Sequence, residues 1–202
     1  MEGSTAPIKE ISNLCIKYDS KLLIDEAHAF GVMGPEGRGE SFGLKEPISI
    51  ISGTFGKAFG SGGAFLATDK ITGDNLIQNC GAFRYTTALA PPICASALAA
   101  LNLIRSNPSW GSKLKEQSIA LRDKLSQVGW QRPVGGGPII SIILGSDELA
   151  MDYQKRLEAH GLLTVAIRPP TVPEGKSRLR LVIRRNTPVQ AFERLFEVLK
   201  NK

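Results

Sequence analysis

Short continuous runs of apolar residues alternate with segments of helical period along the first part of the chain. The runs predict buried strands, because each is too short for a helix, at residues 21–24, 48–52 and 63–68. Residues 1–20 predict a turn followed by a helix, and further helical patterns lie at residues 71–79 and 91–105. The last of these opens with Pro91-Pro92, which suits a first helical turn. This alternation predicts an α/β fold.

The rest of the chain combines the two kinds of element in another order. Helices are predicted at residues 112–128, 147–160 and 188–199. Strands are predicted at residues 139–144, 162–166 and 177–183. Antiparallel pairing of these strands gives a small α+β domain. Ser106-Asn107-Pro108 has the composition of a hinge, so we expect one domain at 1–107 and a second at 108–202.

The charge of the chain does not indicate a nucleic-acid-binding protein. The 202 residues carry a formal net charge of +6, but the basic residues are scattered. The densest basic cluster is Arg178, Arg180, Arg184 and Arg185. It has neither interleaved aromatic residues nor a known binding motif, so a solvated strand edge that also attracts substrate is the simpler interpretation.

The cysteines and histidines exclude several other kinds of site. Three cysteines without a spacing pattern and two histidines argue against a disulfide framework, a zinc site or a histidine-rich metal site. They fit the reducing conditions of the cytoplasm. No apolar run is long enough for a membrane span, so we expect no membrane partner.

The first candidate for chemistry is Lys57, which lies in a glycine-rich stretch directly after the predicted strand at residues 48–52. Its ammonium could hold a phosphate, or its amine could be covalently occupied as a Schiff base. The spacing excludes a phosphate-binding P-loop, because Ile51 stands where that motif needs glycine and Ala58 stands where it needs Ser or Thr. A surface lysine in a glycine turn remains the alternative.

The second candidate is the segment Asp25-Glu26-Ala27-His28, at the carboxyl end of the predicted strand at residues 21–24. Ligands of open α/β sheets bind outside this end of the strands. A carboxylate suits a pyridinium nitrogen, and pyridoxal phosphate enzymes combine such an acid with a Schiff-base lysine. The alternatives are a helix N-cap for Asp25 and a hydrogen-bonded structural role for His28.

These motifs together resemble one family, the α-oxoamine synthases. The residues that carry the resemblance are Asp25-Glu26-Ala27-His28, Gly31, Gly34, Gly37-Arg38-Gly39 and Gly53-Thr54-Phe55-Gly56-Lys57-Ala58-Phe59-Gly60. The family consists of fold-type I pyridoxal phosphate enzymes that condense an amino acid with an acyl thioester and release CO2. The resemblance implies the C-terminal part of the fold-type I large domain, followed by a small α+β domain, with pyridoxal 5'-phosphate as cofactor.

The resemblance also implies roles for individual residues. Asp25 would pair with the pyridine nitrogen, and His28 would contact the ring hydroxyl. Thr54 would bind the phosphate, Lys57 would form the Schiff base and act as the base, and Thr87 would reach the phosphate of the neighbouring subunit in a homodimer. For Thr54 the alternative is a turn-capping hydroxyl, and for Thr87 a β-branched residue in an ordinary strand.

A further implied site is the segment from Ala166 to Pro173, which contains Arg168 and Thr171. Its prolines predict an extended backbone, and a guanidinium binds a carboxylate through two hydrogen bonds. In the family the arginine that matches Arg168 holds the amino-acid carboxylate, so Arg168 and Thr171 are predicted to bind substrate. A surface arginine in a proline loop is the alternative.

Among family members, this segment is most similar to the enzyme of biotin synthesis that joins L-alanine to a pimeloyl thioester, supplied on coenzyme A or an acyl-carrier protein. Members of the glycine C-acetyltransferase or serine palmitoyltransferase type are alternatives. In the family, Met1-Glu2-Gly3 matches an internal segment, so the N-terminal half of the usual large domain is expected to be missing. A non-catalytic fragment is therefore a further alternative.

Overall fold

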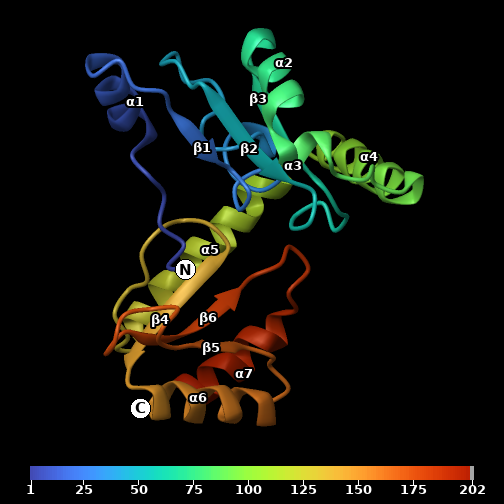
Figure 1. Cartoon of the computed structure of the whole chain (residues 1–202). Coiled ribbons are helices and arrows are strands. Elements are labelled where there is room, and N and C mark those ends of the chain that lie inside the picture. The colour runs from blue at the N-terminus through green and yellow to red at the C-terminus, as the bar shows by residue number, and fades with distance from the viewer. Residues whose placement is uncertain (201–202) are drawn as a thin grey trace. The chain divides into compact units, whose positions relative to one another are not determined.

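The computed structural model of the chain describes residues 1–200 and divides into two compact units (Figure 1). The N-terminal unit comprises residues 6–112. The C-terminal unit comprises the described residues from 113 onward together with residues 1–5, so two separate segments of the chain form it. The two domains expected at residues 1–107 and 108–202 remain a prediction.

The N-terminal unit is built on a three-stranded sheet in the order β1-β2-β3. β1 (Leu23–Asp25) runs parallel to β2 (Ile50–Thr54), and β3 (Ala64–Thr68) pairs antiparallel with β2. The predicted strand at residues 48–52 thus lies two residues too early. The expected glycine turn does not start at Gly53, because this residue pairs with Phe65 and the ring occupies the space above it. A Cβ atom on Gly53 would lie 2.4 Å from the ring of Phe65.

The helices of this unit begin and end close to the predicted residues. They are α1 (Ile8–Lys17), α2 (Lys70–Asn79), α3 (Gly81–Arg84) and α4 (Pro91–Arg105), and a short 3-10 helix, η1 (Pro35–Gly37), lies in the loop after β1. The Asp69 carboxylate caps α2 by accepting a hydrogen bond from the Thr72 backbone at 2.9 Å. This bond and one from the Thr72 hydroxyl lower the pKa of Asp69.

The C-terminal unit contains an antiparallel three-stranded sheet in the order β4-β6-β5, as the α+β prediction requires. The strands are β4 (Ile139–Gly145), β5 (Val165–Ile167) and β6 (Ser177–Val182). The helices are α5 (Trp110–Gln127), whose first residues belong to the N-terminal unit, α6 (Asp147–Ala159) and α7 (Val189–Leu199). β5 is shorter than the predicted strand at residues 162–166, because its pairing with β6 begins only at Val165.

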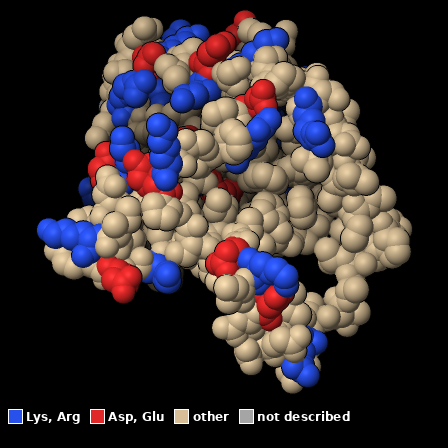
Figure 2. Space-filling view, turned by 90° about the horizontal axis from the view of Figure 1, so that it is seen from above, with Lys and Arg blue, Asp and Glu red and all other residues tan. Residues whose placement is uncertain are grey.

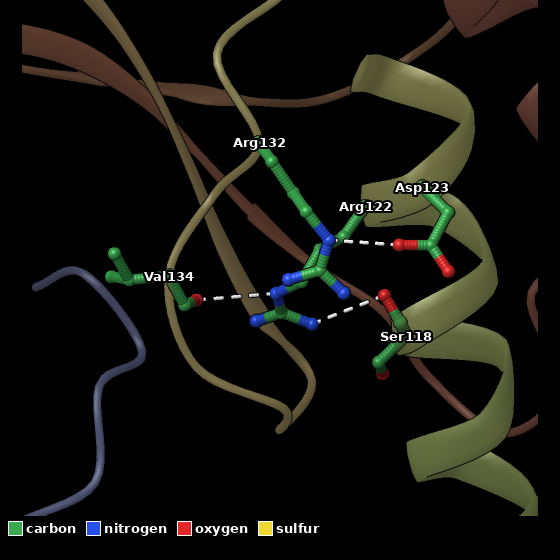
Figure 3. Close-up of polar contacts among 5 residues, drawn as sticks. All are labelled: Ser118, Arg122, Asp123, Arg132 and Val134. Carbon is green, nitrogen blue, oxygen red and sulfur yellow. Dashed lines mark hydrogen bonds and ion pairs between the residues drawn. The ribbon is translucent and has the colours of Figure 1, made fainter. Parts of the chain in front are cut away.

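The core of the C-terminal unit contains an arginine. The Arg122 side chain of α5 is fully buried and donates hydrogen bonds to the backbone carbonyls of Ser118 and Val134, at 3.1 and 3.2 Å (Figure 3). It also donates to the Ile139 carbonyl at 2.6 Å. Burial lowers the pKa of this guanidinium, and the neighbouring charge of Arg132 lowers it further. Arg122 therefore ties α5 to the chain segment that leads into β4.

The first residues of the chain form a strap on the C-terminal unit. The Glu2 carboxylate accepts a hydrogen bond from the buried Arg178 guanidinium at 2.7 Å. This bond lowers the pKa of Glu2. Gly3 has a φ of +77°, and a Cβ atom there would lie 2.2 Å from the carbonyl oxygen of Ile139. Glycine is therefore required where the strap crosses the start of β4.

Charged side chains of both signs are interspersed on the face shown in Figure 2. No large patch of a single sign is visible there, as expected from the scattered basic residues. Among the described residues, no helix has the length and apolar composition that a membrane span requires.

Candidate functional site

Asp25 is the last residue of β1, at the carboxyl end where the sequence predicts a ligand site. Its register partner on β2 is Ser52, two residues before the end of that strand. One carboxylate oxygen, Oδ1, accepts a hydrogen bond from the Ala27 N–H at 2.8 Å. The segment that follows is a series of turns, so the helix N-cap alternative for Asp25 is wrong. The local bond fixes the direction of the carboxylate, and the side chain is exposed to solvent.

His28 lies in the turn three residues after Asp25 and is also exposed. The turn is closed by the Ala29 and Phe30 N–H groups, which donate to the Glu26 carbonyl at 2.9 and 2.7 Å. The proposed contact of His28 with a cofactor ring remains a prediction, and its placement beside Asp25 is compatible with that role.

A residue that the sequence reasoning did not single out anchors the glycine-rich loop. The Glu26 side chain is buried and accepts hydrogen bonds from the backbone N–H groups of Ser41 and Glu40, at 2.7 and 3.1 Å. A Cβ atom on Gly39 would lie 3.0 Å from this carboxylate. Glu26 therefore holds the loop of residues 31–43 against the turn that carries His28. In the sequence, only the position of Glu26 next to Asp25 indicates a functional role. This position does not show whether the carboxylate anchors a loop or takes part in chemistry.

Lys57 lies in a tight turn between β2 and β3 and is exposed. The Gly60 N–H donates to the Lys57 carbonyl at 3.0 Å, and the Ser61 N–H donates to the Phe55 carbonyl at 2.9 Å. These bonds fix the backbone on both sides of the lysine while its side chain remains accessible. The turn follows Thr54, the last residue of the strand whose register places Ser52 beside Asp25.

The Thr54 hydroxyl makes hydrogen bonds inside this turn. It donates to the Gly63 carbonyl at 3.1 Å and accepts from the Gly56 N–H at 3.1 Å. This is the turn-capping arrangement that the sequence left open as the alternative. A phosphate could bind this hydroxyl only if the O–H turned away from Gly63, so the phosphate role of Thr54 remains a prediction.

Four phenylalanines support the lysine turn from within the unit: Phe30, Phe55, Phe59 and Phe65. The rings of Phe30 and Phe59 are stacked with centroids 5.0 Å apart, and Phe59 is buried. Aromatic pairs at this spacing are attractive beyond the area that they bury. The cluster gives the site a rigid base, and the sequence reasoning did not identify it because its members come from three separate segments.

Thr87 lies in the irregular segment between α3 and α4 and is exposed. α3 ends at Arg84 and no strand follows it in the described residues before α4, so the alternative of an ordinary strand at Thr87 is wrong. The following helix is tied to the lysine turn by the Ser61 hydroxyl, which donates to the Ile93 carbonyl at 2.8 Å. The contact of Thr87 with a neighbouring subunit's phosphate stays a prediction.

Arg168 and Thr171 belong to the C-terminal unit, directly after β5. The expected extended backbone is wrong here, because the Thr171 N–H donates to the Arg168 carbonyl at 3.0 Å and closes a turn. The peptide bond between Pro169 and Pro170 is cis. Both Arg168 and Thr171 are exposed, so the predicted carboxylate binding is sterically open and remains a prediction.

The C-terminal unit holds a second arginine with unused hydrogen-bonding capacity. The Nε atom of Arg180 on β6 is buried and has no hydrogen-bond partner among the described residues. Its direct partner across the sheet is Ser141 of β4, whose buried hydroxyl is likewise unpartnered in the described part of the chain. Residues opposite each other in an antiparallel pair lie on the same face of the sheet. Two unpartnered donors on one face of a sheet can together bind an anion. The sequence did not indicate this pair, because it does not show that the two groups are buried.

The donor set of the N-terminal unit fits pyridoxal phosphate. The cofactor needs a carboxylate for its ring nitrogen, an amine for its aldehyde carbon and donors for its phosphate. Asp25 and Lys57 could provide the carboxylate and the amine within one unit, and the Thr54 hydroxyl could serve the phosphate if it turned away from Gly63. Thr87 is expected to serve the phosphate of a neighbouring subunit. The hydrogen bond from Ala27 uses only the Oδ1 oxygen of Asp25, and both Asp25 and Lys57 are exposed.

Comparison with known proteins gives consistent matches. The family model of aminotransferases of class I and II matches residues 1–199. The 8-amino-7-oxononanoate synthase of Methylobacillus flagellatus is 38% identical over 98% of this chain. A solved SPT structure with a PLP internal aldimine has a TM-score of 0.90 at 27% identity and covers 99% of the chain. The 8-amino-7-oxononanoate synthase structure from Francisella tularensis has a TM-score of 0.81 at 26% identity and covers 94%.

The matched proteins are longer than this chain. The chain spans about half of their length, with 51% of the Methylobacillus protein, 51% of the SPT chain and 57% of the Francisella chain covered. The matches confirm the predicted fold class, since both solved structures reproduce the fold of this chain within a larger chain.

Proposed function

The chain belongs to the aminotransferase class I and II family, and from that premise we propose that it carries the lysine-bearing half of a pyridoxal phosphate-dependent α-oxoamine synthase. Such an enzyme joins an amino acid to an acyl thioester with loss of CO2. The observation that carries the proposal is the pairing of β1 with β2. It sets Asp25 beside the strand whose end leads to Lys57.

When bound, pyridoxal phosphate supplies an electron sink for negative charge at the substrate's α-carbon. Asp25 would hold a proton at the ring nitrogen, which keeps that sink effective. His28 would fix the ring through its hydroxyl, and Thr54 would hold the phosphate. The amine of Lys57 would bind the cofactor covalently and, once substrate has replaced it, accept the α-proton.

The proposal can be tested through covalent attachment, without any turnover. Borohydride reduction of the chain after addition of pyridoxal phosphate should fix one cofactor, and peptide mass analysis should place it on Lys57. Lys57→Ala should abolish this fixation. Lys70→Ala, which removes an exposed lysine of the same unit, should leave the fixation unchanged. Cofactor fixed at another lysine in the wild-type chain would refute the assignment.

We propose L-alanine and a pimeloyl thioester as the substrates, with 8-amino-7-oxononanoate as the product. The support comes from the relatives of that name, about 37–38% identical, and from the resemblance of residues 166–173. The match with SPT structures favours a second candidate, in which the same site takes serine and a palmitoyl thioester. Thioesters of pimeloyl, palmitoyl and acetyl groups, each offered with alanine, serine and glycine, would separate these candidates.

Two arginines compete for the substrate carboxylate. Arg168 is the one that the family resemblance indicates, and Arg180 is the one with a buried, unpartnered nitrogen. We expect alanine substitution of the arginine that binds the carboxylate to weaken amino-acid binding at least tenfold, while cofactor fixation stays normal. Alanine substitution of the other arginine should leave amino-acid affinity at the wild-type value. Wild-type amino-acid affinity in both variants would exclude both arginines.

We further propose a homodimer in which Thr87 completes the neighbouring site. Mixing Lys57→Ala with Thr87→Ala then produces heterodimers in which one site has both wild-type residues, so borohydride-fixed cofactor should partly recover. If Thr87 acted within its own chain, each site would lack one residue and nothing would recover. Failure of cofactor retention in every sample would support the alternative of a non-catalytic fragment.

A further inference from the structure

Glu26, which lies between Asp25 and His28 in the sequence, is tied to its surroundings at three points. Its N–H donates to the Ser52 carbonyl of β2 at 2.8 Å. Its carbonyl accepts a hydrogen bond from the Phe30 N–H at 2.7 Å, which helps to close the turn that carries His28. Its side chain is only 3% exposed, and the carboxylate accepts two more hydrogen bonds from the backbone. A residue that is held so completely can hold other parts of the site in place.

The Glu26 carboxylate binds the far end of the loop of residues 31–43. The Ser41 N–H donates to Oε1 at 2.7 Å, and the Glu40 N–H donates to Oε2 at 3.1 Å, so each oxygen has a donor of its own. The Ser41 bond is buried, and a buried amide that loses its acceptor is costly. The carboxylate therefore determines where this end of the loop lies.

The near end of the same loop lies against the turn that carries Lys57. A Cβ atom on Gly31 would lie 3.0 Å from the Ala58 side chain and 3.0 Å from the Phe59 ring. Ala58 and Phe59 directly follow Lys57 in the chain. Because the contact is this close, a shift of the loop at Gly31 changes the support of the lysine turn.

Hydrogen bonds across the loop join its two ends. The Gly31 N–H donates to the Gly37 carbonyl at 2.7 Å, and the Gly39 N–H donates to the Met33 carbonyl at 2.9 Å. These bonds connect the part of the loop that lies on the lysine turn to the part that leads to the Glu26 carboxylate. Glu26 and the lysine turn are thus linked through a continuous series of contacts within the N-terminal unit.

We propose that Glu26 is a positioning residue for Lys57, and that its carboxylate, acting through this loop, holds the lysine turn where the site needs it. The inference rests on the proposed function, in which Asp25 and Lys57 bind opposite ends of one rigid pyridine ring. A rigid ligand that is held at both ends tolerates little change in the separation of the two groups. The Ala27 N–H fixes the direction of the Asp25 carboxylate locally, so the lysine turn is the part that needs support from elsewhere.

Amide hydrogen exchange tests this link in the chain itself, at the Gly60 and Ser61 N–H groups that close the lysine turn. Glu26→Ala should speed exchange at both amides at least tenfold, because the loop no longer supports the turn. The Cys80 amide, which donates to the Leu76 carbonyl at the end of α2 in the same unit, should not change. Unchanged exchange at Gly60 and Ser61 overturns the proposal. An equal rise at Cys80 also overturns it, because Glu26 would then only stabilise the unit as a whole.

Two further variants isolate the carboxylate. Glu26→Gln keeps the volume but offers one acceptor oxygen to two N–H donors, so exchange at Gly60 and Ser61 should rise only about threefold. If Glu26→Ala loses its helical circular dichroism, Glu26→Gln decides the matter, and wild-type exchange in this variant overturns the proposal. Glu36→Gln changes an exposed carboxylate of the same loop and should leave exchange at the wild-type rate.

Cofactor fixation gives the functional measurement. Borohydride-fixed pyridoxal phosphate on Lys57 should form at least tenfold more slowly in Glu26→Ala, and at the wild-type rate in Glu36→Gln. Wild-type fixation in Glu26→Ala, together with faster exchange in the turn, would show that support of the turn does not govern Lys57 and would overturn the proposal. If the wild-type chain fixes no cofactor, the proposed function fails, whereas the exchange rates still decide whether Glu26 holds the lysine turn.

Discussion

The two units of the chain differ in how completely they bury their apolar residues. In the C-terminal unit five aliphatic side chains of α5, β4, α6, β6 and α7 have no exposed surface: Leu125, Ile140, Leu157, Leu179 and Leu199. In the N-terminal unit, Met33 and Phe59 are the only large apolar side chains that are buried among the described residues, and both retain some exposure. The C-terminal unit has a closed core, and the N-terminal unit does not.

α4 shows what this difference teaches. Its 15 residues contain one charged side chain, Arg105, so the helix is apolar all round. Helices of this kind are normally buried on every side. Here one stripe of α4 is partly covered, while Leu98 and Leu103 on the outside are 58% and 57% exposed. The N-terminal unit forms its helices and strands, but the described residues leave much of their apolar surface uncovered.

The largest effect is expected from removing a side chain of the closed core. Leu125→Ala should lower the free energy of unfolding by about 3 kcal/mol, because it deletes buried methyl groups and leaves a cavity. Leu98→Ala, the same change on the exposed face of α4, should alter it by less than about 0.5 kcal/mol. Urea unfolding of both variants measures the contrast. Similar losses would mean that the two units are equally packed.

A smaller loss is expected from the buried arginine. Arg122→Met keeps most of the volume but leaves the carbonyls of Ser118, Val134 and Ile139 without their donor, and should lower the free energy of unfolding by about 2 kcal/mol. Arg132→Met is the matched control. Its ion pair with Asp123 is half-exposed, so this variant should lose less than about 1 kcal/mol. Equal losses in urea unfolding would show that Arg122 does not organise the core.

The strap should give a modest, pH-dependent effect. The pKa of Glu2 is lowered in the folded state, so its pair with Arg178 stabilises fully above the ordinary value of 4.5 and loses its effect as the pH falls through the lowered pKa. Since the Glu2 side chain is 49% exposed, the contribution should stay below about 1 kcal/mol. Unfolding of the wild type and Glu2→Gln should differ at pH 7 and converge in acid. A difference in the free energy of unfolding that does not change with pH would contradict the ion pair between Glu2 and Arg178.

The smallest change in stability is expected on the open surface of α4. Leu98→Glu should reduce binding of a fluorescent hydrophobic dye while changing the free energy of unfolding by less than about 0.5 kcal/mol. Leu163→Glu, at an isolated exposed leucine of the C-terminal unit, should change neither. Unchanged dye fluorescence in Leu98→Glu would show that this helix face is not the exposed apolar surface of the molecule.

The sequence predicted the order and type of the elements because their signals are local. The prolines at the start of α4 act over a few residues, and this helix begins where expected. The apolar run before Asp25 also forms a strand, but β1 begins at Leu23 and includes Asp25, so the strand predicted at residues 21–24 lies too early. The end of β2 was predicted too early, because Gly53 is kept in the strand by the Phe65 ring of β3. That contact joins separate segments and has no local signal.

The candidate site shows the same division. The sequence predicts Asp25 and Lys57 at one edge of the sheet, because the carboxyl ends of paired strands lie together there, and the structure has Asp25 at the end of β1 and Lys57 in the turn after the paired strand β2. The anchoring role of Glu26 and the burial of Arg122 could not. Both residues are charged and stand where an exposed side chain is the ordinary expectation. Only the carbonyl and amide groups that surround them in three dimensions satisfy those charges.

The strap has a consequence for how the protein is made. Glu2 and Arg178 are 176 positions apart, so their pair cannot form until the ribosome has translated the segment that carries Arg178. At about 5–20 residues per second, the ribosome needs about ten to thirty-five seconds between the two residues. Throughout that interval residues 1–5 have no partner on β6, because this strand has not yet been made. Residues 1–5 therefore join the C-terminal unit only after β6 has been translated.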